Sequence, residues 1–355
     1  MLCSTAAARR IHRRGDEFPR APRSVAEMAI TTERDELTFE RLVEPHKRGL
    51  HAHCYRMLGS LHDAEDAYQE ALLRAWRALP RLREDAALRA WLYRIATNVC
   101  LSAIARRPKR VLPADYGPSW SATHEVGAPE SELLWLEPYP GEELESGYAA
   151  PEARYEQREA VELAFVAALQ HLPAQQRAVL ILREVLGFSA RETSESLGTT
   201  VASVNSALQR ARRTVDERLP ERSQQETLRA LGDERARDLL HHYIDAWERH
   251  DVPAIVALLA EDIVVEMPPW AAWWRGRDTV EAMLGTPEKP CFEAVRGIPV
   301  HANGQLAFAS YGYEDGRFAA IGINVIALRG DRITVATGFV KPELLARFAL
   351  PAELA

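Results

Sequence analysis

The sequence lacks several features that would place it in a specialised class of protein. Its four cysteines form no CxxC pair and no Cys/His ligand spacing, which argues against a disulfide framework or a zinc site and favours a reducing compartment. No apolar run approaches the roughly 18 residues that a membrane helix needs. The N-terminus has arginines but not the apolar segment of a signal peptide. We therefore expect a cytoplasmic protein without membrane contact, metal or cofactor.

The molecule as a whole also lacks a net positive charge. The formal net charge is -7 over 355 residues, so any contact with nucleic acid must come from local cationic patches. The length predicts two or three domains. Residues 1–34 show arginines among Ala, Pro and Ser without periodicity, and we expect a disordered tail or an early start codon with Met28 as the true initiator.

The stretch from Leu172 to Leu219 predicts three helices that end in a helix-turn-helix. Pro173 is suited to the start of the first helix and Gly187 to its end. Ser189 and Glu192 predict a capping box for a short second helix, which stops at Gly198. The last helix has an apolar stripe at helical spacing, which we expect to be buried: Val201, Val204, Leu208, Ala211 and Val215.

The other side of this last helix has no large apolar residue. Such a face fits a DNA major groove, because Asn and Gln pair with base edges and Arg reaches guanine or phosphate. The alternative is the solvated face of an ordinary helical bundle. The face consists of Thr200, Ala202, Ser203, Asn205, Ser206, Gln209, Arg210 and Arg213.

Three further helices are predicted between residues 35 and 110. The second has an alanine-rich inner side, with an outer patch at i, i+3, i+4 and i+7 spacing formed by Asp66, Gln69, Glu70 and Leu73. This patch is either a solvated face or a surface that docks another protein. We expect both acids in it to be exposed, opposite Ala67 and Ala71.

The third of these helices ends in a tip of four cations without an acid: Arg106, Arg107, Lys109 and Arg110. Rings that stack on bases and cations that hold phosphates are what single-stranded DNA binding uses. The alternative is core aromatics followed by a cationic helix end that the helix dipole favours. The candidate DNA contacts are Trp91, Tyr93, Asn98, Ser102, Arg106 and Arg107.

Residues 111–152 carry nine acidic side chains and no Lys or Arg, and their prolines favour an extended chain. This segment, called the linker below, is either a flexible tether or a polyanion that occupies a cationic channel.

Residues 233–347 read as helices followed by a meander of strands, an α+β arrangement. The pocket candidates are Glu266, Trp270, Trp273, Trp274, His301, Tyr311 and Tyr313. The alternative is an aromatic core without chemistry. No two carboxylates have a spacing that suits an acid and a base, so we do not expect an enzyme.

The helical part resembles sigma-70-type RNA polymerase factors of the extracytoplasmic-function group. The likeness rests on AEDAYQEALLRAW at 64–76, LRAWLYRIATNVC at 88–100, LPAQQRAVLILREVLG from Leu172 and VNSALQRAR at 204–212. EDIVVEMPPW at 261–270 and WRGRDTV at 274–280 are similar to the SnoaL-like branch of the NTF2-like fold. Sigma factors with such a tail form a subgroup typified by actinobacterial sigma G.

The resemblance implies a multidomain fold of two all-α sigma domains followed by an α+β NTF2-like cone. The expected boundaries are a tail at 1–34, domain 2 at 35–110, the linker at 111–152, domain 4 at 153–219, a second linker at 220–232 and a SnoaL-like regulatory domain at 233–347.

The resemblance also implies partners for these faces. The patch on the second helix would bind the β′ clamp helices of core polymerase, and domain 4 would meet the β flap. The Trp91–Arg107 helix would hold the minus-ten promoter element, and the Thr200–Arg213 helix would read the minus-thirty-five element. The linker would thread toward the RNA exit path, and a small molecule or protein could regulate the C-terminal domain.

Some residues depart from the family pattern. Ser102 stands where the family often has Asp, and Ala105 where a basic residue is common. Thr193, Ser194 and Ser196 occupy positions that are usually apolar or small, and a buried hydroxyl without a partner costs about 1–3 kcal/mol.

Two rival functions stay open at the level of sequence. One is an isomerase or cyclase of the NTF2-like type, fused to a DNA-binding region. The other is a ligand-sensing repressor that never meets polymerase. The acidic linker and the Asp66, Gln69 and Glu70 face discriminate between the hypotheses, because a simple repressor needs neither.

Overall fold

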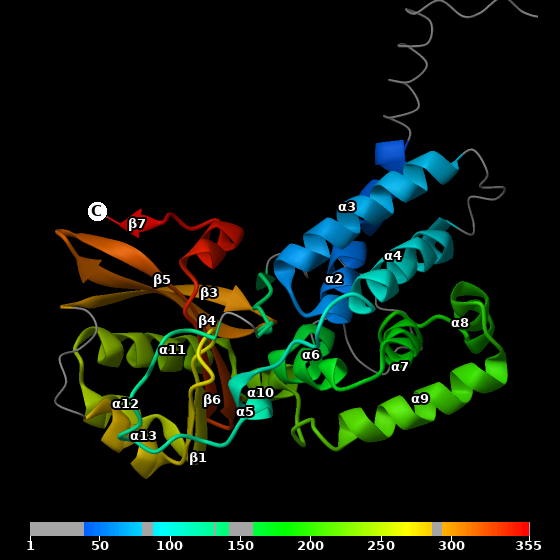
Figure 1. Cartoon of the computed structure of the whole chain (residues 1–355). Coiled ribbons are helices and arrows are strands. Elements are labelled where there is room, and N and C mark those ends of the chain that lie inside the picture. The colour runs from blue at the N-terminus through cyan, green and yellow to red at the C-terminus, as the bar shows by residue number, and fades with distance from the viewer. Residues whose placement is uncertain (1–38, 80–87, 131–132, 142–158, 286–292, 355) are drawn as a thin grey trace, which may run out of the picture. The chain divides into compact units, whose positions relative to one another are not determined.

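The computed structural model describes residues 39–79, 88–130, 133–141, 159–285 and 293–354 (Figure 1). The expected tail at 1–34 lies outside these ranges, as does part of the linker. From Pro45 onward the chain forms one compact unit. Helices come first and a sheet follows, which confirms the predicted fold class.

The first group of helices is α2 (Lys47–Leu58), α3 (Leu61–Ala78) and α4 (Leu88–Ile104), preceded by the 3-10 turn η1 (Glu44–His46). Gly59 ends α2 with a left-handed φ of 68°, and the Ser60 side chain accepts a bond from Asp63 N–H to cap α3. Ala67 and Ala71 are buried, as predicted, and let α3 approach α2 and α4 closely.

The second group contains η5 (Glu159–Val161), α6 (Leu163–Gln170), α7 (Ala174–Leu180), the π-helical turn η6 (Ile181–Val185), α8 (Ala190–Leu197) and α9 (Val201–Asp216). The predicted capping box of Ser189 and Glu192 is present at α8, and Gly198 ends that helix at a φ of 62°. The Thr200 side chain caps α9. The helix-turn-helix therefore has the caps that its sequence predicts.

Two of the predicted hydroxyl positions in α8 are buried. The Ser194 hydroxyl donates to Arg191 O at 2.8 Å, whereas the Thr193 hydroxyl has no hydrogen-bond partner in the described part of the chain. Val201 was predicted to be buried but is 42% exposed; the other four members of its stripe are buried. Val201 is the first residue of α9, where the helix has no preceding turn to cover it.

The C-terminal part begins with α10 (Gln224–Leu231), α11 (Asp233–Glu248) and α12 (Val252–Ala257). The stretch 220–232 was expected to be a plain polar connection; instead a Ser223–Glu226 capping box starts α10 there. The Gln224 side chain then bonds both the N–H and the carbonyl oxygen of residue 328 in the sheet.

The sheet contains β1 (Leu259–Glu266), β2 (Trp273–Arg275), β3 (Val295–Ala302), β4 (Gln305–Glu314), β5 (Arg317–Arg329), β6 (Arg332–Phe339) and β7 (Glu353–Leu354), with α13 (Arg277–Leu284) after β2 and the 3-10 segment η7 (Pro342–Phe348) after β6. The strand order is β2-β1-β6-β5-β4-β3, and β7 pairs with β5. Among the strand pairs that the structure describes, β1 and β6 run parallel and the others antiparallel. Hairpin turns join β4 to β5 within residues 311–318 and β5 to β6 within residues 329–332.

Helix α11 packs against β3 and β4 and forms the core of this part (Figure 1). Tyr243 meets Phe308 edge to face, with ring centroids 5.9 Å apart. Gly297 is needed beneath this helix, because a Cβ there would lie 2.6 Å from a methyl group of Ile244. The sequence indicated α11 and the longer strands but missed the short strand β2.

Candidate functional site

The predicted docking patch on α3 is exposed. The side chains of Asp66 and Glu70 are 62% and 44% accessible, Gln69 is exposed, and Leu73 is half exposed. Among the residues that the structure describes, the patch makes local contacts only, such as Arg74 Nε to Glu70 at 2.7 Å. The face is therefore free for a partner, with one apolar side chain among polar ones.

The predicted minus-ten helix α4 exposes Asn98 and Ser102 and leaves Trp91 half-buried, and Arg106 is exposed in the turn that follows the helix. Tyr93 was expected to contact DNA, but it is 4% exposed and packs edge to face on His53 and Phe188. The helical period explains the error, since Tyr93 follows the buried Leu92 onto the inner side of α4. Tyr93 therefore supports this helix from within.

The basic tip after α4 contains no acid of its own, as the sequence shows, but an acid from another helix pairs with it. Asp63 of α3 is 5% exposed and accepts bonds from both Arg107 and Arg110. Arg110 also donates to Trp135 O at 2.6 Å. The acid escaped notice because it comes from another helix, 44 residues before Arg107.

The predicted reading face of α9 is exposed along its whole length, from Ala202 to Arg213. The opposite stripe packs on α7, with Val204, Ala211 and Val215 almost fully buried. Thr200 is exposed but its hydroxyl accepts from Ser203 N–H at 3.1 Å, so its structural task is to cap the helix. The arrangement presents amide, hydroxyl and guanidinium groups outward on a rigid helix.

The pocket candidates of the C-terminal part do not come together. Glu266 lies on β1, His301 on β3 and Tyr311 on β4, with β6 and β5 between β1 and β4. His301 is exposed, and the Tyr311 hydroxyl donates to Pro351 O at 3.0 Å. Tyr313 lies two residues further along β4, where it is half-buried and its ring meets Phe318 edge to face.

The linker covers the aromatic run at residues 270–274, which was predicted to belong to a pocket. Trp273 and Trp274 are 9% and 2% exposed. The indole N–H groups of Trp270, Trp273 and Trp274 donate to the carbonyl oxygens of Gly127, Gly117 and Ser121 at 2.7, 2.8 and 3.3 Å. Two tryptophans of β2 and one from the β1–β2 turn thus hold residues 117–127 of the linker.

Backbone and ring contacts strengthen this attachment. Trp120 N–H donates to Trp273 O at 2.8 Å, and the Trp120 ring meets Trp274 edge to face at 5.9 Å. The short helix α5 (Pro113–Tyr116) begins over Glu266, whose carboxylate accepts Ala114 N–H at 3.3 Å and the Thr337 hydroxyl at 3.2 Å. The linker was expected to be extended, either as a flexible tether or as a polyanion in a cationic channel. Over its described residues 111–130 and 133–141 it is docked on the C-terminal part and on the helices.

Burial governs the ionisation of Glu266. Desolvation raises the pKa of this carboxyl to about 7, although its two hydrogen bonds oppose the rise. Glu137 behaves in the opposite way. Burial favours its neutral form, but bonds from Lys341 and Ser60 and the charges of Lys341 and Arg110 lower its pKa overall. Glu137 is therefore an ionised group that ties the linker to α3 and to the end of β6.

The turn between β3 and β4 is a junction that the sequence analysis missed. The Asn303 side chain accepts from Tyr139 N–H at 2.9 Å and donates to the Tyr55 hydroxyl at 2.9 Å and to Val161 O at 2.7 Å. Gln305 accepts from Leu163 N–H at 2.8 Å. One turn therefore bonds α2, the linker, η5 and α6. An Asn-Gly pair at 303–304 between two strand-like runs was the available signal.

The described residues contain no helix long and apolar enough to cross a membrane. Within the same ranges, no cluster of three metal-ligating side chains occurs.

The chain contains a helical bundle with an exposed polar face on α3, a helix-turn-helix and an acidic linker, and an α+β domain follows them. This combination is that of a sigma factor of RNA polymerase with a fused C-terminal domain. The Sigma-70 region 2 family matches residues 42–110, the Sigma-70 region 4 family matches residues 162–215, and the SnoaL-like domain family matches residues 240–336. These segments are called region 2, region 4 and the SnoaL-like domain below.

Comparison with known proteins makes the assignment specific: the chain belongs to the extracytoplasmic-function (ECF) RNA polymerase sigma factors. It is 40% identical over 319 residues to the ECF RNA polymerase sigma factor SigG of Mycobacterium tuberculosis, covering 89% of this chain and 85% of the relative. It is 30% identical over 194 residues to SigM of the same species, covering 54% of this chain and 83% of that protein.

A solved structure has the same architecture. The crystal structure of the ECF sigma factor SigJ of Mycobacterium tuberculosis matches with a TM-score of 0.54 at 20% identity, covering 89% of this chain and 99% of that chain. The chain is thus a transcription initiation factor rather than an enzyme, and it binds core polymerase and promoter DNA. The rival readings as a fused isomerase or a repressor are set aside.

Proposed function

We propose that separate faces of the two helical regions carry out the steps of initiation. The exposed patch of Asp66, Gln69, Glu70 and Leu73 would bind the β′ clamp helices, and region 4 would meet the β flap. Trp91, Asn98, Ser102, Arg106 and Arg107 would contact the minus-ten element, and the outer face of α9 would read the minus-thirty-five element. Exposure and residue type support each assignment. The site of action would be the cytoplasm, where polymerase and promoters meet.

We further propose that the SnoaL-like domain regulates this activity by holding the sigma regions closed. The observation that carries the proposal is the Asn303 side chain, which bonds region 2 through Tyr55, the linker through Tyr139 and η5 through Val161. Asn303 is fully buried. Any movement that separates these segments must therefore break several buried hydrogen bonds, each costing about 1 kcal/mol or more if left unpaired.

The docked linker supports the same idea. If the linker is to thread toward the RNA exit path, residues 117–127 must first leave the three tryptophans that hold them. A regulator of the SnoaL-like domain, whether a small molecule or a protein, would act by its differential affinity for the closed and open arrangements. The closed arrangement would be the resting state and opening would precede initiation.

The test uses two turns of the same sheet. Asn303 and Asp315 are both followed by Gly and have left-handed φ angles of 55° and 50°. Asn303→Gly keeps the turn but removes the side chain that bonds three segments. Asp315→Gly is the matched control, because Asp315 lies in the exposed β4–β5 turn.

We expect Asn303→Gly to bind core polymerase more tightly than wild type and to raise run-off transcription, whereas Asp315→Gly should match wild type. Equal core binding by the two variants would refute the closed resting state. Absence of core binding by every variant and by wild type would instead count against the assignment of the docking face.

A further inference from the structure

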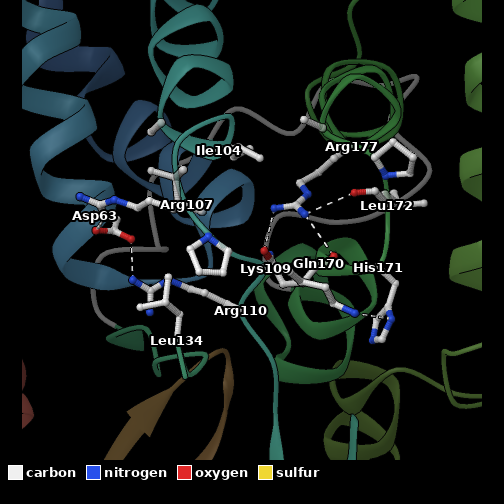
Figure 2. Close-up of a pocket in the computed structure, with 15 residues that line it drawn as sticks. Asp63, Ile104, Arg107, Lys109, Arg110, Leu134, Gln170, His171, Leu172 and Arg177 are labelled. Carbon is white, nitrogen blue, oxygen red and sulfur yellow. Dashed lines mark hydrogen bonds and ion pairs between the residues drawn. The ribbon is translucent and has the colours of Figure 1, made fainter. Parts of the chain in front are cut away.

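A cavity of about 360 Å³ lies where α2, α3 and α4 of region 2 meet the α6–α7 turn and the linker (Figure 2). This volume is within the range of about 300–1,000 Å³ typical of small-molecule sites. Region 2 contributes Leu58, Asp63, Ala103, Ile104 and the basic tip from Arg107 to Arg110; the linker contributes Leu134; and residues 170–174 with Arg177 complete the wall.

The wall of the cavity has more cations than acids. Arg107, Lys109, Arg110 and Arg177 line it, against the single carboxylate of Asp63. Asp63 already accepts bonds from Arg107 and Arg110. With His171 neutral, the charged side chains that line the cavity have a net charge of +3, and Lys109 and Arg177 have no carboxylate partner among them. An anion would therefore be favoured there.

Lys109 supplies hydrogen-bond donors. Its ammonium contacts His171 Nδ1 at 2.9 Å, and an ammonium can only donate. The proton of the imidazole is therefore on Nε2, which lies 3.0 Å from the Asp115 carboxylate. Lys109 has two further N–H groups, and Arg107 has donors beyond the one given to Asp63.

Arg177 adds a buried charge. It is 4% exposed, and its Nη groups donate to Gln170 Oε1 and to the carbonyl oxygens of Met57, Gln170 and Leu172. Among the described residues no carboxylate pairs with it, and burial lowers its pKa to about 10. Buried charges in proteins are normally paired. Arg177 thus attracts an anion in the cavity electrostatically, while Lys109 and Arg107 offer the free hydrogen-bond donors.

The rest of the wall is apolar. Apolar side chains line the same cavity as the cations: Leu58, Ile104, Leu134, Leu172 and Pro173. Figure 2 shows Ile104, Leu134 and Leu172 around the cavity that Lys109 and Arg177 enter. A ligand that satisfies both parts has an anionic head and an apolar body.

We propose that this cavity binds an organic phosphate of nucleotide size, with the phosphates near Lys109 and Arg107 and the apolar body near Ile104 and Leu172. The wall belongs to region 2, the linker and region 4 together, so the site is complete only while these segments are in contact. A ligand that binds only this arrangement stabilises it by RT ln(1 + [L]/Kd). This stabilisation of the closed arrangement, which is the second step of the proposal, rests on the closed resting state proposed above. Binding of the ligand, the first step, does not.

Calorimetry on the full-length protein at constant ionic strength tests the site. The probes are ATP, pyrophosphate, orthophosphate and adenosine. We expect ATP to bind one to one and more tightly than pyrophosphate. Lys109→Gln removes one charge and should weaken ATP binding by about tenfold or more. Arg235→Gln, on the exposed side of α11, makes the same charge change outside the cavity and should leave the Kd unaltered.

Absence of saturable binding by ATP and pyrophosphate would overturn the proposal, and so would equal Kd values for wild type and Lys109→Gln. ATP binding no tighter than pyrophosphate would remove the apolar half of the assignment. Retention on immobilised core polymerase then tests the second step. ATP should reduce retention of wild type but not of Lys109→Gln, and an ATP effect common to both would contradict that step while leaving the calorimetric result intact.

Discussion

The Asn303 Nδ2 group lies 2.9 Å from the Tyr55 hydroxyl oxygen, although the two residues are 248 positions apart in the chain. Both side chains are fully buried. Burial raises the pKa of Tyr55, with the Asn303 bond opposing the rise, so the phenol keeps its proton and donates it to Glu137 O at 2.7 Å. One chain of hydrogen bonds therefore connects the β3–β4 turn, region 2 and the linker. A displacement of one of these segments would alter the hydrogen bonds of the other two.

The α3 patch gives a prediction about core polymerase. Asp66→Arg with Glu70→Arg should weaken core binding at least tenfold and leave thermal stability within about 0.5 kcal/mol, because exposed side chains contribute little to folding. Pull-down with purified core polymerase measures the first effect and thermal unfolding the second. Glu234→Arg with Asp238→Arg repeats the same charge change at the same spacing on the exposed side of α11. Similar binding by both double variants would contradict the docking assignment.

Recognition of the minus-thirty-five element gives the second prediction. Arg210→Ala and Arg213→Ala should each weaken promoter binding, by roughly 1–3 kcal/mol where a bidentate base contact is lost. A residue that touches only phosphate should instead weaken all sequences equally and reduce the salt slope by about one. Fluorescence anisotropy on cognate and scrambled duplexes separates these cases. Wild-type affinity in both variants at fixed salt would exclude α9 as the reading helix.

The acidic residues of the linker give the third prediction. The structure divides them into acids that hold the fold, such as Glu137 and Asp115, and exposed ones such as Glu125 and Glu130. Reversing the exposed pair to Lys should leave core binding largely unchanged but raise the ratio of abortive to full-length transcripts, if the linker occupies a cationic path in polymerase. Glu234→Lys with Asp238→Lys is the control. An unchanged ratio would make the linker a passive tether in transcription.

Much of the helical part was predictable because its signals are local. Ser189, Glu192 and Gly198 act within one helix, so their sequence spacing is enough to specify α8. The helical period of α9 likewise separated its buried stripe from its exposed face. The exception is Val201, the first residue of the helix, which no preceding turn covers.

The contacts between segments were not predictable in the same way. Trp273 and the Gly117 carbonyl oxygen are 156 residues apart, and nothing in either local pattern says which surface covers the tryptophan. Asp63 neutralises the basic tip from a different helix, and Tyr93 was assigned to DNA because a sequence motif does not distinguish the inner from the outer side of α4. Each error concerns what lies opposite a residue, which only tertiary packing decides.

Glu266 gives a prediction about pH. Its pKa is raised from 4.5 to about 7, mainly by burial, so the folded protein holds this proton more strongly than the unfolded chain. The stabilisation is complete below about pH 4.5 and is lost as pH rises toward 7, a change of roughly 3 kcal/mol for this group. Glu266→Gln keeps an acceptor for Ala114 N–H without the titration.

The measurement is the free energy of unfolding of both proteins from pH 5 to pH 8. The difference between Glu266→Gln and wild type should move in favour of the variant as pH rises. A difference that is constant across this range would show that Glu266 is ionised in the folded protein throughout.

The tryptophan attachment of the linker gives the last prediction. Trp273→Phe keeps an aromatic ring against the linker but removes the N–H that the Gly117 carbonyl accepts. The backbone bond from Trp120 N–H to Trp273 O should then open more often, and hydrogen exchange in peptides spanning residues 117–127 should accelerate several-fold. Trp247→Phe is the control, because Trp247 lies on α11 and packs against Tyr243 rather than the linker. A chain truncated after Arg222 loses all three tryptophans and sets the upper limit of exchange. If the linker is held as described, Trp273→Phe should fall between wild type and the truncated chain and should bind core polymerase more tightly than Trp247→Phe. Exchange as slow in the truncated chain as in wild type would mean that the SnoaL-like domain does not hold the linker.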